Sequence, residues 1–245
     1  MVFEQKAKIG FYDIDALGNM KLTALLQHIN EVSWLHAEEL GCGINATFEI
    51  GLAFIIQRMG LRILQLPTLN QKISVRTWPG EMTRSAFKRN GEILDVDGNK
   101  LVEWESLWVL IDINERKIKR PSAFPLEIPI VGRLGVEVET QKIINTAVET
   151  DPSTFYHHTV QFSEMDINYH MNNAIYGNLV ANVLADTALP KITEWQEVQF
   201  NYINEAKLAE VVTVDCNQMG DKVYVTGGTT DKSVFVAEIK TWELT

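Results

Sequence analysis

The chain contains an internal repeat. The segment IGFYDIDALGNMKLTALLQHI, which begins at Ile9, aligns with VQFSEMDINYHMNNAIYGNLV, which begins at Val160, at an offset of 151 residues. The alignment superposes identical residues, namely Phe11 on Phe162, Asp15 on Asp166 and Met20 on Met171. Self-similarity at a fixed offset is the signature of a duplicated structural unit. The sequence therefore predicts two copies of one fold.

Each copy begins with a short strand, a polar loop and a helix. In the first copy we expect a helix that is capped by Thr23 and ended by Gly41. In the second copy the helix is expected to begin at Asn172 or Asn173 and to stop before Pro190. Both helices are apolar around most of their circumference, which predicts that both are buried.

Strand-like segments rich in β-branched and aromatic residues follow each helix. Turn signals separate them, so we expect antiparallel sheets and an α+β fold in which each sheet wraps a central helix. The connection between the copies is rich in proline and weakly periodic. We therefore expect an N-terminal domain over 1–130, a linker over 131–153 and a C-terminal domain over 154–245.

Composition excludes several classes of function. The formal net charge of -10 argues against general nucleic-acid binding, which needs clustered lysine and arginine. No basic leader with an apolar stretch begins the chain and no uninterrupted apolar run could cross a bilayer, so we expect a cytoplasmic protein without a membrane span. Cys42 and Cys216 lie far apart, which argues against a zinc site or a disulfide framework.

The segment MDINYHMNNAIYGN carries polar groups that core packing does not require. Asp166, Asn168 and His170 lie two apart, so in an extended strand their side chains would leave the same face. A carboxylate or an imidazole can activate water. A helix that begins at Asn172 or Asn173 would offer free N–H groups and a positive dipole end to a developing oxyanion.

A structural explanation competes with this chemistry, because aspartate and asparagine before a helix usually form caps or turns. The first copy has Leu17 and Asn19 at the positions of Asn168 and His170. The fold itself therefore does not need this amide and this imidazole. The aspartate is present in both copies, so the structural explanation suits it best.

Three motifs resemble one family, the acyl-acyl carrier protein (acyl-ACP) thioesterases. The string D-x-N-x-H-x-N-N before a buried helix is similar to the second half of these proteins. SLWVLIDINERKIKRP resembles their Ser-x-Trp-Val strand with its arginine-rich exit, and WQEVQFNYINEA resembles the segment that carries a glutamate. The resemblance covers nearly the whole chain. It implies a double hotdog fold, in which two tandem hotdog domains each wrap a curled antiparallel sheet around a long helix.

The resemblance also implies roles for the polar residues. Glu205 and His170 would activate a water molecule and Asn168 would hold the water or the thioester. Asp166 would orient the site, although its role could be exchanged with that of Glu205. Many plant members have a cysteine after the glutamate, but here Ala206 follows, so a cysteine nucleophile is not expected at that position.

The function implied is hydrolysis of fatty acyl-ACP to free fatty acid in the second domain, without metal or cofactor. A basic cluster of Arg116, Lys117, Lys119 and Arg120 is expected to dock the acidic carrier.

Three alternatives remain open: hydrolysis of acyl-coenzyme A, noncatalytic acyl binding, and a hotdog dehydratase, for which the chain lacks a His-x-Pro-Gly-like loop. A homodimer is possible. Trp104 and Trp108 are expected to be core residues.

Overall fold

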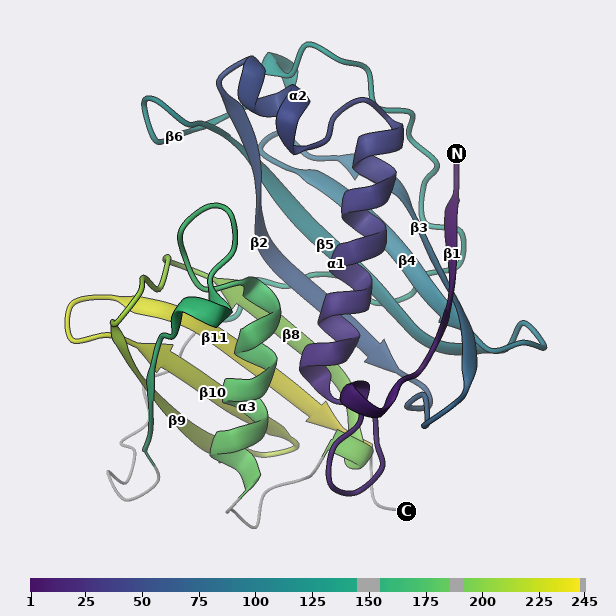
Figure 1. The fold of residues 1–245 in the computed structure, drawn as a ribbon, viewed down its shortest axis with the longest axis vertical. Coiled ribbons are helices and arrows are strands. Elements are labelled where there is room, and N and C mark those ends of the chain that lie inside the picture. The colour runs from purple at the N-terminus through teal and green to yellow at the C-terminus, as the bar shows by residue number, and fades with distance from the viewer. Residues whose placement is uncertain (145–154, 186–191, 243–245) are drawn as a thin grey trace.

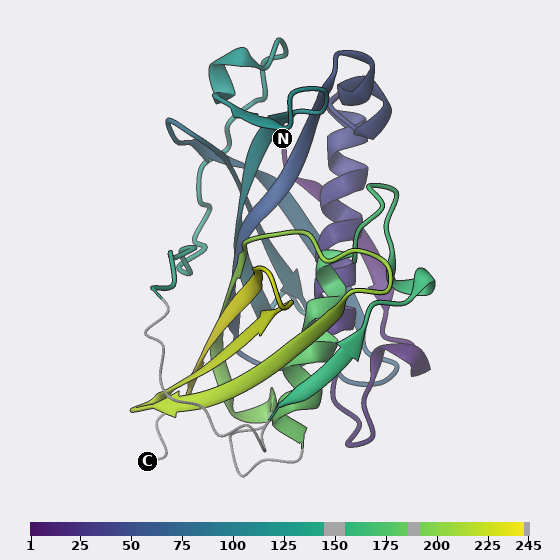
Figure 2. The ribbon, with the colours of Figure 1, turned by 90° about the vertical axis from the view of Figure 1, so that its left-hand side faces the viewer.

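The computed structural model describes residues 1–144, 155–185 and 192–242. Within these ranges the strands form one 11-stranded antiparallel sheet, and the helices cover one of its faces (Figures 1 and 2). The spatial order of the strands is β1-β3-β4-β5-β2-β8-β11-β10-β9-β7, and β6 pairs with β5. No described helix is long and apolar enough to cross a membrane.

The first half of the chain supplies the longer helix and the longer strands. Its elements are β1 (Phe3–Lys8), α1 (Leu22–Glu39), α2 (Ile44–Glu49), β2 (Leu52–Ile63), β3 (Lys72–Met82), β4 (Phe87–Leu94), β5 (Lys100–Asp112) and β6 (Lys117–Lys119). The elements of the second half are β7 (Tyr156–Thr159), α3 (Tyr176–Ala185), β8 (Trp195–Tyr202), β9 (Val211–Met219), β10 (Lys222–Gly228) and β11 (Ser233–Thr241). Short 3₁₀ turns at Phe11–Asp13, Phe162–Glu164 and Asn173–Ile175 precede the two main helices.

The two halves have the same strand order. The first runs β1-β3-β4-β5-β2 from its edge to the centre of the sheet, and the second runs β7-β9-β10-β11-β8. At the centre β2 pairs with β8, from Arg58 opposite Asn201 to Arg62 opposite Glu197. Two hotdog units therefore share one sheet, which confirms the double hotdog fold.

The loops that precede the helices match at the predicted offset. An isolated bridge joins Ile14 to Met20 in the first copy, and its counterpart joins Met165 to Met171 in the second. Both 3₁₀ turns before these bridges also coincide at an offset of 151 residues. The prediction of a duplicated unit is therefore confirmed at the level of individual backbone contacts.

The predicted starts of both helices need correction. Lys21, not Thr23, is the N-cap of α1, and Thr23 lies inside the helix, where its hydroxyl donates to Asn178 Oδ1 of α3. Gly41 follows the helix with a φ of 72°, as expected for the residue that ends it. In the second half Asn172 is the predicted cap, but it caps a 3₁₀ turn, and α3 begins only at Tyr176. The predicted stop before Pro190 lies outside the described residues.

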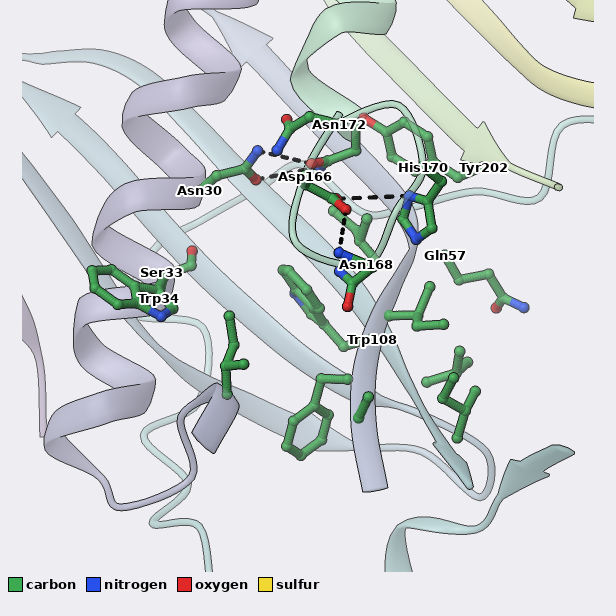
Figure 3. A pocket seen from close by; sticks show the side chains of 18 of the residues that line it. Asn30, Ser33, Trp34, Gln57, Trp108, Asp166, Asn168, His170, Asn172 and Tyr202 are labelled. Atoms are coloured by element: carbon green, nitrogen blue, oxygen red, sulfur yellow. Dashed lines mark hydrogen bonds and ion pairs between the residues drawn. The ribbon is translucent and has the colours of Figure 1, made fainter. Parts of the chain in front are cut away.

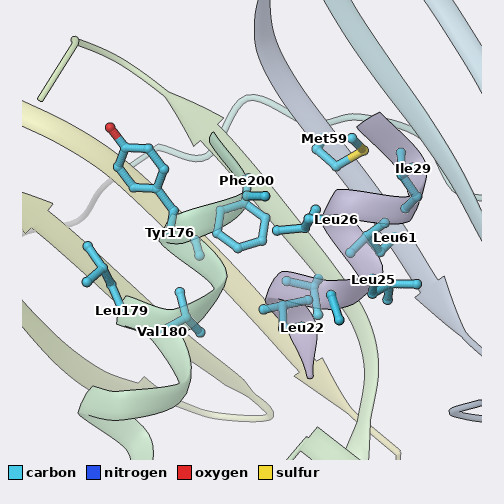
Figure 4. Packing of buried hydrophobic residues seen from close by; sticks show 14 of the residues in the cluster. Leu22, Leu25, Leu26, Ile29, Met59, Leu61, Tyr176, Leu179, Val180 and Phe200 are labelled. Carbon is cyan, nitrogen blue, oxygen red and sulfur yellow. The ribbon is translucent and has the colours of Figure 1, made fainter. Parts of the chain in front are cut away.

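The core lies between the helices and the sheet and continues from one half into the other (Figure 4). Leu22, Leu25, Leu26 and Ile29 of α1 pack with residues of β2, β8 and α3 such as Met59, Phe200 and Val180. α1 and α3 approach closely at Gly177, where an added Cβ would lie 2.8 Å from the Thr23 backbone nitrogen. The two helices are thus fixed relative to each other beside the polar loop of the second half.

Part of the predicted linker is bound to the outer face of the sheet. The N–H groups of Glu137 and Val138 donate to Oε1 of the buried Glu103, at 2.9 and 3.1 Å. Thr140 N–H donates to Oε1 of Glu105, which has no exposed side-chain surface, at 3.0 Å. These carboxylates hold the segment in place by accepting backbone hydrogens that would otherwise be unpaired. The domain boundaries themselves stay a prediction, and residues 145–153 lie outside the described part of the chain.

Candidate active site

The loop of the second half brings Asp166 and His170 together (Figure 3). Asp166 Oδ1 accepts a hydrogen bond from the Asn168 N–H at 2.8 Å, and its Oδ2 lies 3.7 Å from His170 Nδ1. In the first copy Asp15 Oδ1 accepts from the Leu17 N–H at 2.8 Å. One Asp166 oxygen therefore has the loop-forming role shared by both copies. The other is free to orient an imidazole that only the second copy has.

The apex of this loop has an unusual backbone conformation. Tyr169 has a φ of 63°, while the equivalent residue of the first copy is Gly18 with a φ of 83°. A left-handed conformation suits glycine and strains a side chain such as tyrosine. The loop retains the same shape in spite of the change in residue type, and both Asn168 and Tyr169 are exposed.

Asn172 and Asn173 have different partners. Asn172 Oδ1 accepts the Ala174 N–H at 2.9 Å, which is a capping interaction. The side chain of Asn173 forms an amide pair with Asn30 of α1, with a hydrogen bond of 3.0 Å from Asn30 Nδ2 to Asn173 Oδ1. Among the described residues the backbone N–H of Asn173 has no partner. The predicted group of free N–H donors at this helix start is therefore reduced, and the Asn173 N–H is the candidate for contact with an oxyanion.

Glu205 follows β8 and makes a contact that the sequence did not reveal. Its Oε1 accepts a hydrogen bond from Arg116 Nη2 at 2.7 Å. Arg116 belongs to the hairpin between β5 and β6 of the first half, and its side chain is 69% exposed while that of Glu205 is 35% exposed. One member of the predicted docking cluster thus touches the predicted catalytic carboxylate.

The sequence analysis also missed Tyr176, the first residue of α3. Its side chain is buried and lines the same cavity as Asp166 and Glu205. Burial raises the pKa of the Tyr176 hydroxyl, and the carboxylates of Asp166, Glu210 and Glu205 raise it further. The Tyr176 hydroxyl therefore stays protonated near neutral pH, close to both predicted carboxylates. No local pattern marked it, because a tyrosine in an apolar helix is ordinarily a core residue.

A cavity of about 1470 Å³ joins the polar loop to the first half of the molecule. Its lining includes Asp166, Asn168, His170, Asn172, Asn173 and Glu205. From the first half α1 contributes Asn30, Ser33 and Trp34, and β5 contributes Trp108 (Figure 3). The cavity is larger than the roughly 300–1,000 Å³ of ordinary small-molecule sites, and a long flexible ligand would fit it.

The expectation that both tryptophans of β5 are core residues is confirmed for Trp104, whereas Trp108 is partly buried, packs against the core and also lines the cavity. Trp104 is fully buried in the main core. Trp108, four residues later on the same strand, lines the cavity, and its Nε1 donates to Ser106 Oγ at 2.9 Å. β5 runs from the main core, where Trp104 is enclosed, to the wall of the cavity, where Trp108 lies. The two tryptophans therefore differ in their surroundings although they lie on the same strand.

The basic cluster divides into bound and free side chains. Lys119 Nζ lies 3.3 Å from Asp112 Oδ2 and 3.2 Å from Glu115 Oε2, so ion pairs within the hairpin largely neutralise its charge. The Lys117 side chain is 74% exposed, with only a 4.0 Å contact to Glu115. Arg120 is exposed as well. Lys117 and Arg120 are the members of the cluster that remain accessible to a partner.

Three other histidines, His28, His157 and His158, have local partners. His157 lies 3.0 Å from Thr213 Oγ1, and His158 Nε2 lies 2.8 Å from Glu164 Oε2. His28 Nε2 is 3.7 Å from Asp13 Oδ2. In the described part of the chain no three histidine, cysteine or acidic side chains gather in a way that could hold a metal ion.

Comparison with known proteins gives consistent matches. Residues 1–122 match the model of the acyl-ACP thioesterase N-terminal domain, and residues 148–240 match that of the C-terminal domain. The chain is 24% identical over 209 residues to acyl-[acyl-carrier-protein] hydrolase FATB2 of Cuphea viscosissima, covering 81% of this chain and 50% of that protein. It is 24% identical over 203 residues to dodecanoyl-[acyl-carrier-protein] hydrolase of Umbellularia californica, covering 76% of this chain and 52% of that protein. The chain therefore spans about half the length of the curated relatives it matches.

Solved structures share the fold over almost the whole chain. An acyl-ACP thioesterase of Bacteroides thetaiotaomicron superposes with a TM-score of 0.85 at 19% identity, covering 98% of both chains. The 12:0-ACP thioesterase of Umbellularia californica gives a TM-score of 0.78 at 18% identity, covering 98% of this chain and 96% of the other. At these identities the likeness establishes the common fold.

Proposed function

This chain belongs to the acyl-ACP thioesterase family, and from that premise we propose that it hydrolyses the thioester of fatty acyl-ACP and releases free fatty acid. The observation that carries the proposal is the position of Asp166, His170 and Glu205 on the wall of a single cavity. An imidazole and carboxylates beside a cavity long enough for an acyl chain supply what thioester hydrolysis requires.

In the proposed mechanism His170 and Glu205 remove a proton from water as it attacks the thioester carbonyl carbon. Asp166 faces Nδ1 of His170, which leaves Nε2 to receive the proton. The Asn173 N–H stabilises the negative charge that develops on the carbonyl oxygen. The carbon–sulfur bond then breaks, the carrier thiol takes up the proton, and a free fatty acid remains. Asn168, at the loop apex, holds the water or the thioester.

The choice of carrier separates this proposal from hydrolysis of acyl-coenzyme A. At low salt we expect a higher kcat/KM for an acyl chain on carrier protein than for the same chain on coenzyme A, because basic side chains attract the acidic carrier. The advantage should shrink as salt screens these charges. Equal kcat/KM values on both carriers at low salt would contradict the preference for carrier protein.

Reversal of charge at Lys117 tests the docking surface. We expect Lys117→Glu to raise KM for acyl-ACP by roughly threefold to tenfold and to change kcat less, since the side chain is exposed and is not among those that line the cavity. Lys6→Glu is the matched control, because Lys6 is an exposed lysine on the edge strand β1. If KM is unchanged in the Lys117 variant, the carrier docks elsewhere.

The cysteines test the role of water as the nucleophile. Cys42 and Cys216 are both buried, and burial raises the pKa of each thiol, so neither forms the thiolate that attack requires. The double variant Cys42→Ser, Cys216→Ser should keep kcat within about tenfold of the wild type. Intact-mass measurement during turnover should find no acylated enzyme. A burst of carrier thiol together with an acyl adduct on either cysteine would disprove the water mechanism.

The proposal extends to two properties that the fold leaves open, a cytoplasmic location and association into a homodimer. Noncatalytic acyl binding is a further alternative. It predicts that acyl-ACP binds without any release of thiol, which distinguishes it from both forms of hydrolysis.

A further inference from the structure

An arginine without an acidic partner lines the cavity in the first half of the molecule. Arg89 lies on β4, and its Nη1 donates to His36 Nδ1 of α1 at 3.0 Å and to Thr77 Oγ1 at 3.3 Å. No carboxylate of the described residues lies within ion-pair distance of Arg89. Its Nε and Nη2 make no hydrogen bond with the described residues, although the side chain borders the cavity that also contains His170.

His36, the partner of Arg89, also has an unsatisfied group, although it does not line the cavity itself. It has no exposed surface, it stacks on Phe3, and its Nε2 has no hydrogen-bond partner. Burial and the charge of Arg89 lower the pKa of His36 to about 4, so the ring is neutral near pH 7. Since Nδ1 accepts a hydrogen from Arg89, the ring proton is on Nε2. Arg89 therefore offers the cavity N–H donors with no matching acceptor, and the neutral His36 ring does not compensate its charge.

The guanidinium retains its charge in this position. Burial lowers the pKa of Arg89 only to about 10, which is still well above neutral pH. Arg89 is partly buried and faces the cavity without an opposite charge, so a ligand that supplies the missing anion and displaces water there would bind favourably. A planar guanidinium whose Nε–Nη2 edge is free is suited to a carboxylate, which can accept two parallel hydrogen bonds.

The position of Arg89 relates this subsite to the reacting end of the cavity. Arg89 pairs with Ser106 of β5, and Ser106 pairs with Met59 of β2. β2 adjoins β8, which leads into Glu205. With a strand spacing of about 4.8 Å, Arg89 is about 10 Å across the sheet from β2. The thioester site lies beyond β8, one strand further, so an acyl chain bound there would extend past β2 and β5 before its tail met the guanidinium.

From these contacts we propose that the cavity accepts acyl chains whose far end carries a carboxylate, with Arg89 as the residue that binds that carboxylate. The substrates would be monothioesters of dicarboxylic acids. The inference rests on the proposed thioesterase function and adds to it the chemical class of the acyl chain. A chain with a methyl end would place hydrocarbon against the guanidinium and leave its free N–H groups unsatisfied.

The test compares matched acyl chains on the same carrier protein: adipoyl with hexanoyl, suberoyl with octanoyl, and sebacoyl with decanoyl. We expect the wild type to prefer the carboxylated member of at least one pair by about 10- to 100-fold in kcat/KM, the usual range for a charge-assisted hydrogen-bonded pair. Arg89→Met should reverse the preference by lowering hydrolysis of the carboxylated chain and raising that of its apolar partner. Arg84→Met removes an exposed cation outside the cavity and should leave the preference as in the wild type.

Further measurements distinguish failure of the Arg89 inference from misfolding of a variant and from failure of the proposed thioesterase function. Arg89→Lys retains the charge without the planar fork and should retain part of the preference, which keeps the test valid if the methionine variant does not fold. Calorimetric titration with free suberate should show binding to the wild type that is lost in the Arg89 variants. A wild type that prefers the apolar chain in every pair would overturn the inference and leave the thioesterase proposal intact. Absence of hydrolysis for every chain, with acyl-ACP still bound, would instead refute the proposed function.

Discussion

Replacing His170 with alanine is expected to lower kcat on acyl-ACP by about 10²- to 10⁴-fold, the usual effect of losing an acid–base group. The imidazole lies beside Asp166 on the cavity wall, where no other histidine is found among the lining residues. Its loop is held by backbone contacts that do not use the side chain, such as the 3.0 Å bond from Asp166 N–H to the His170 carbonyl oxygen. The His170→Ala variant should therefore keep its fold and lose only catalytic activity.

The internal repeat provides the control for this variant. Asn19 is the counterpart of His170 in the first copy, and its carbonyl oxygen accepts the Asp15 N–H at 2.8 Å in the same way. Asn19→Ala should cost little activity, because the first half has no imidazole at this position. If Asn19→Ala were folded by circular dichroism and as inactive as His170→Ala, the first half would have to contain a second site.

Glu205→Gln should produce a loss of similar size, about 10²- to 10⁴-fold in kcat. The amide oxygen of glutamine can still accept the hydrogen bond from Arg116, so the loop keeps its contact with the hairpin of the first half. What the amide cannot do is take a proton from water. Steady-state measurement should therefore find kcat reduced and KM little changed.

Glu210→Gln is the matched control for that loss. Glu210 lies in the same loop, forms an ion pair with Lys232 and does not line the cavity. Its replacement should leave kcat near the wild-type value. If Glu205→Gln retained full activity, His170 with Asp166 would be the base, and the roles of the two carboxylates would be exchanged.

The duplicated architecture could be predicted because it leaves a signal within the sequence. The offset of 151 residues aligned the loops correctly, and the glycine after α1 and the asparagine cap of the second half were both identified from local chemistry. The start of α1 was misplaced because Thr23 is a favourable cap in isolation. In the fold its hydroxyl binds Asn178, a partner 155 residues away. Such a contact depends on the docking of α1 against α3, which no local pattern contains.

The candidate site was predicted as a set of residues but not as an arrangement. Residues two apart in one loop could be grouped from spacing alone, whereas the contact of Arg116 with Glu205 joins segments 89 residues apart. The Arg89 subsite was invisible for the same reason, since its character depends on a missing carboxylate partner. That Arg89 has no carboxylate beside it can be recognised only when the side chains around it have been placed in the structure.

The central claim is that this chain cleaves the thioester, and product analysis with the purified wild type tests it most directly. Acyl-ACP should yield free fatty acid and carrier thiol in equal amounts, continuously over many turnovers, as expected for attack by water without a stable acyl-enzyme. Acyl-ACP that remains intact while bound to the protein, with neither thiol nor fatty acid released, would contradict the claim and identify the chain as an acyl-binding protein.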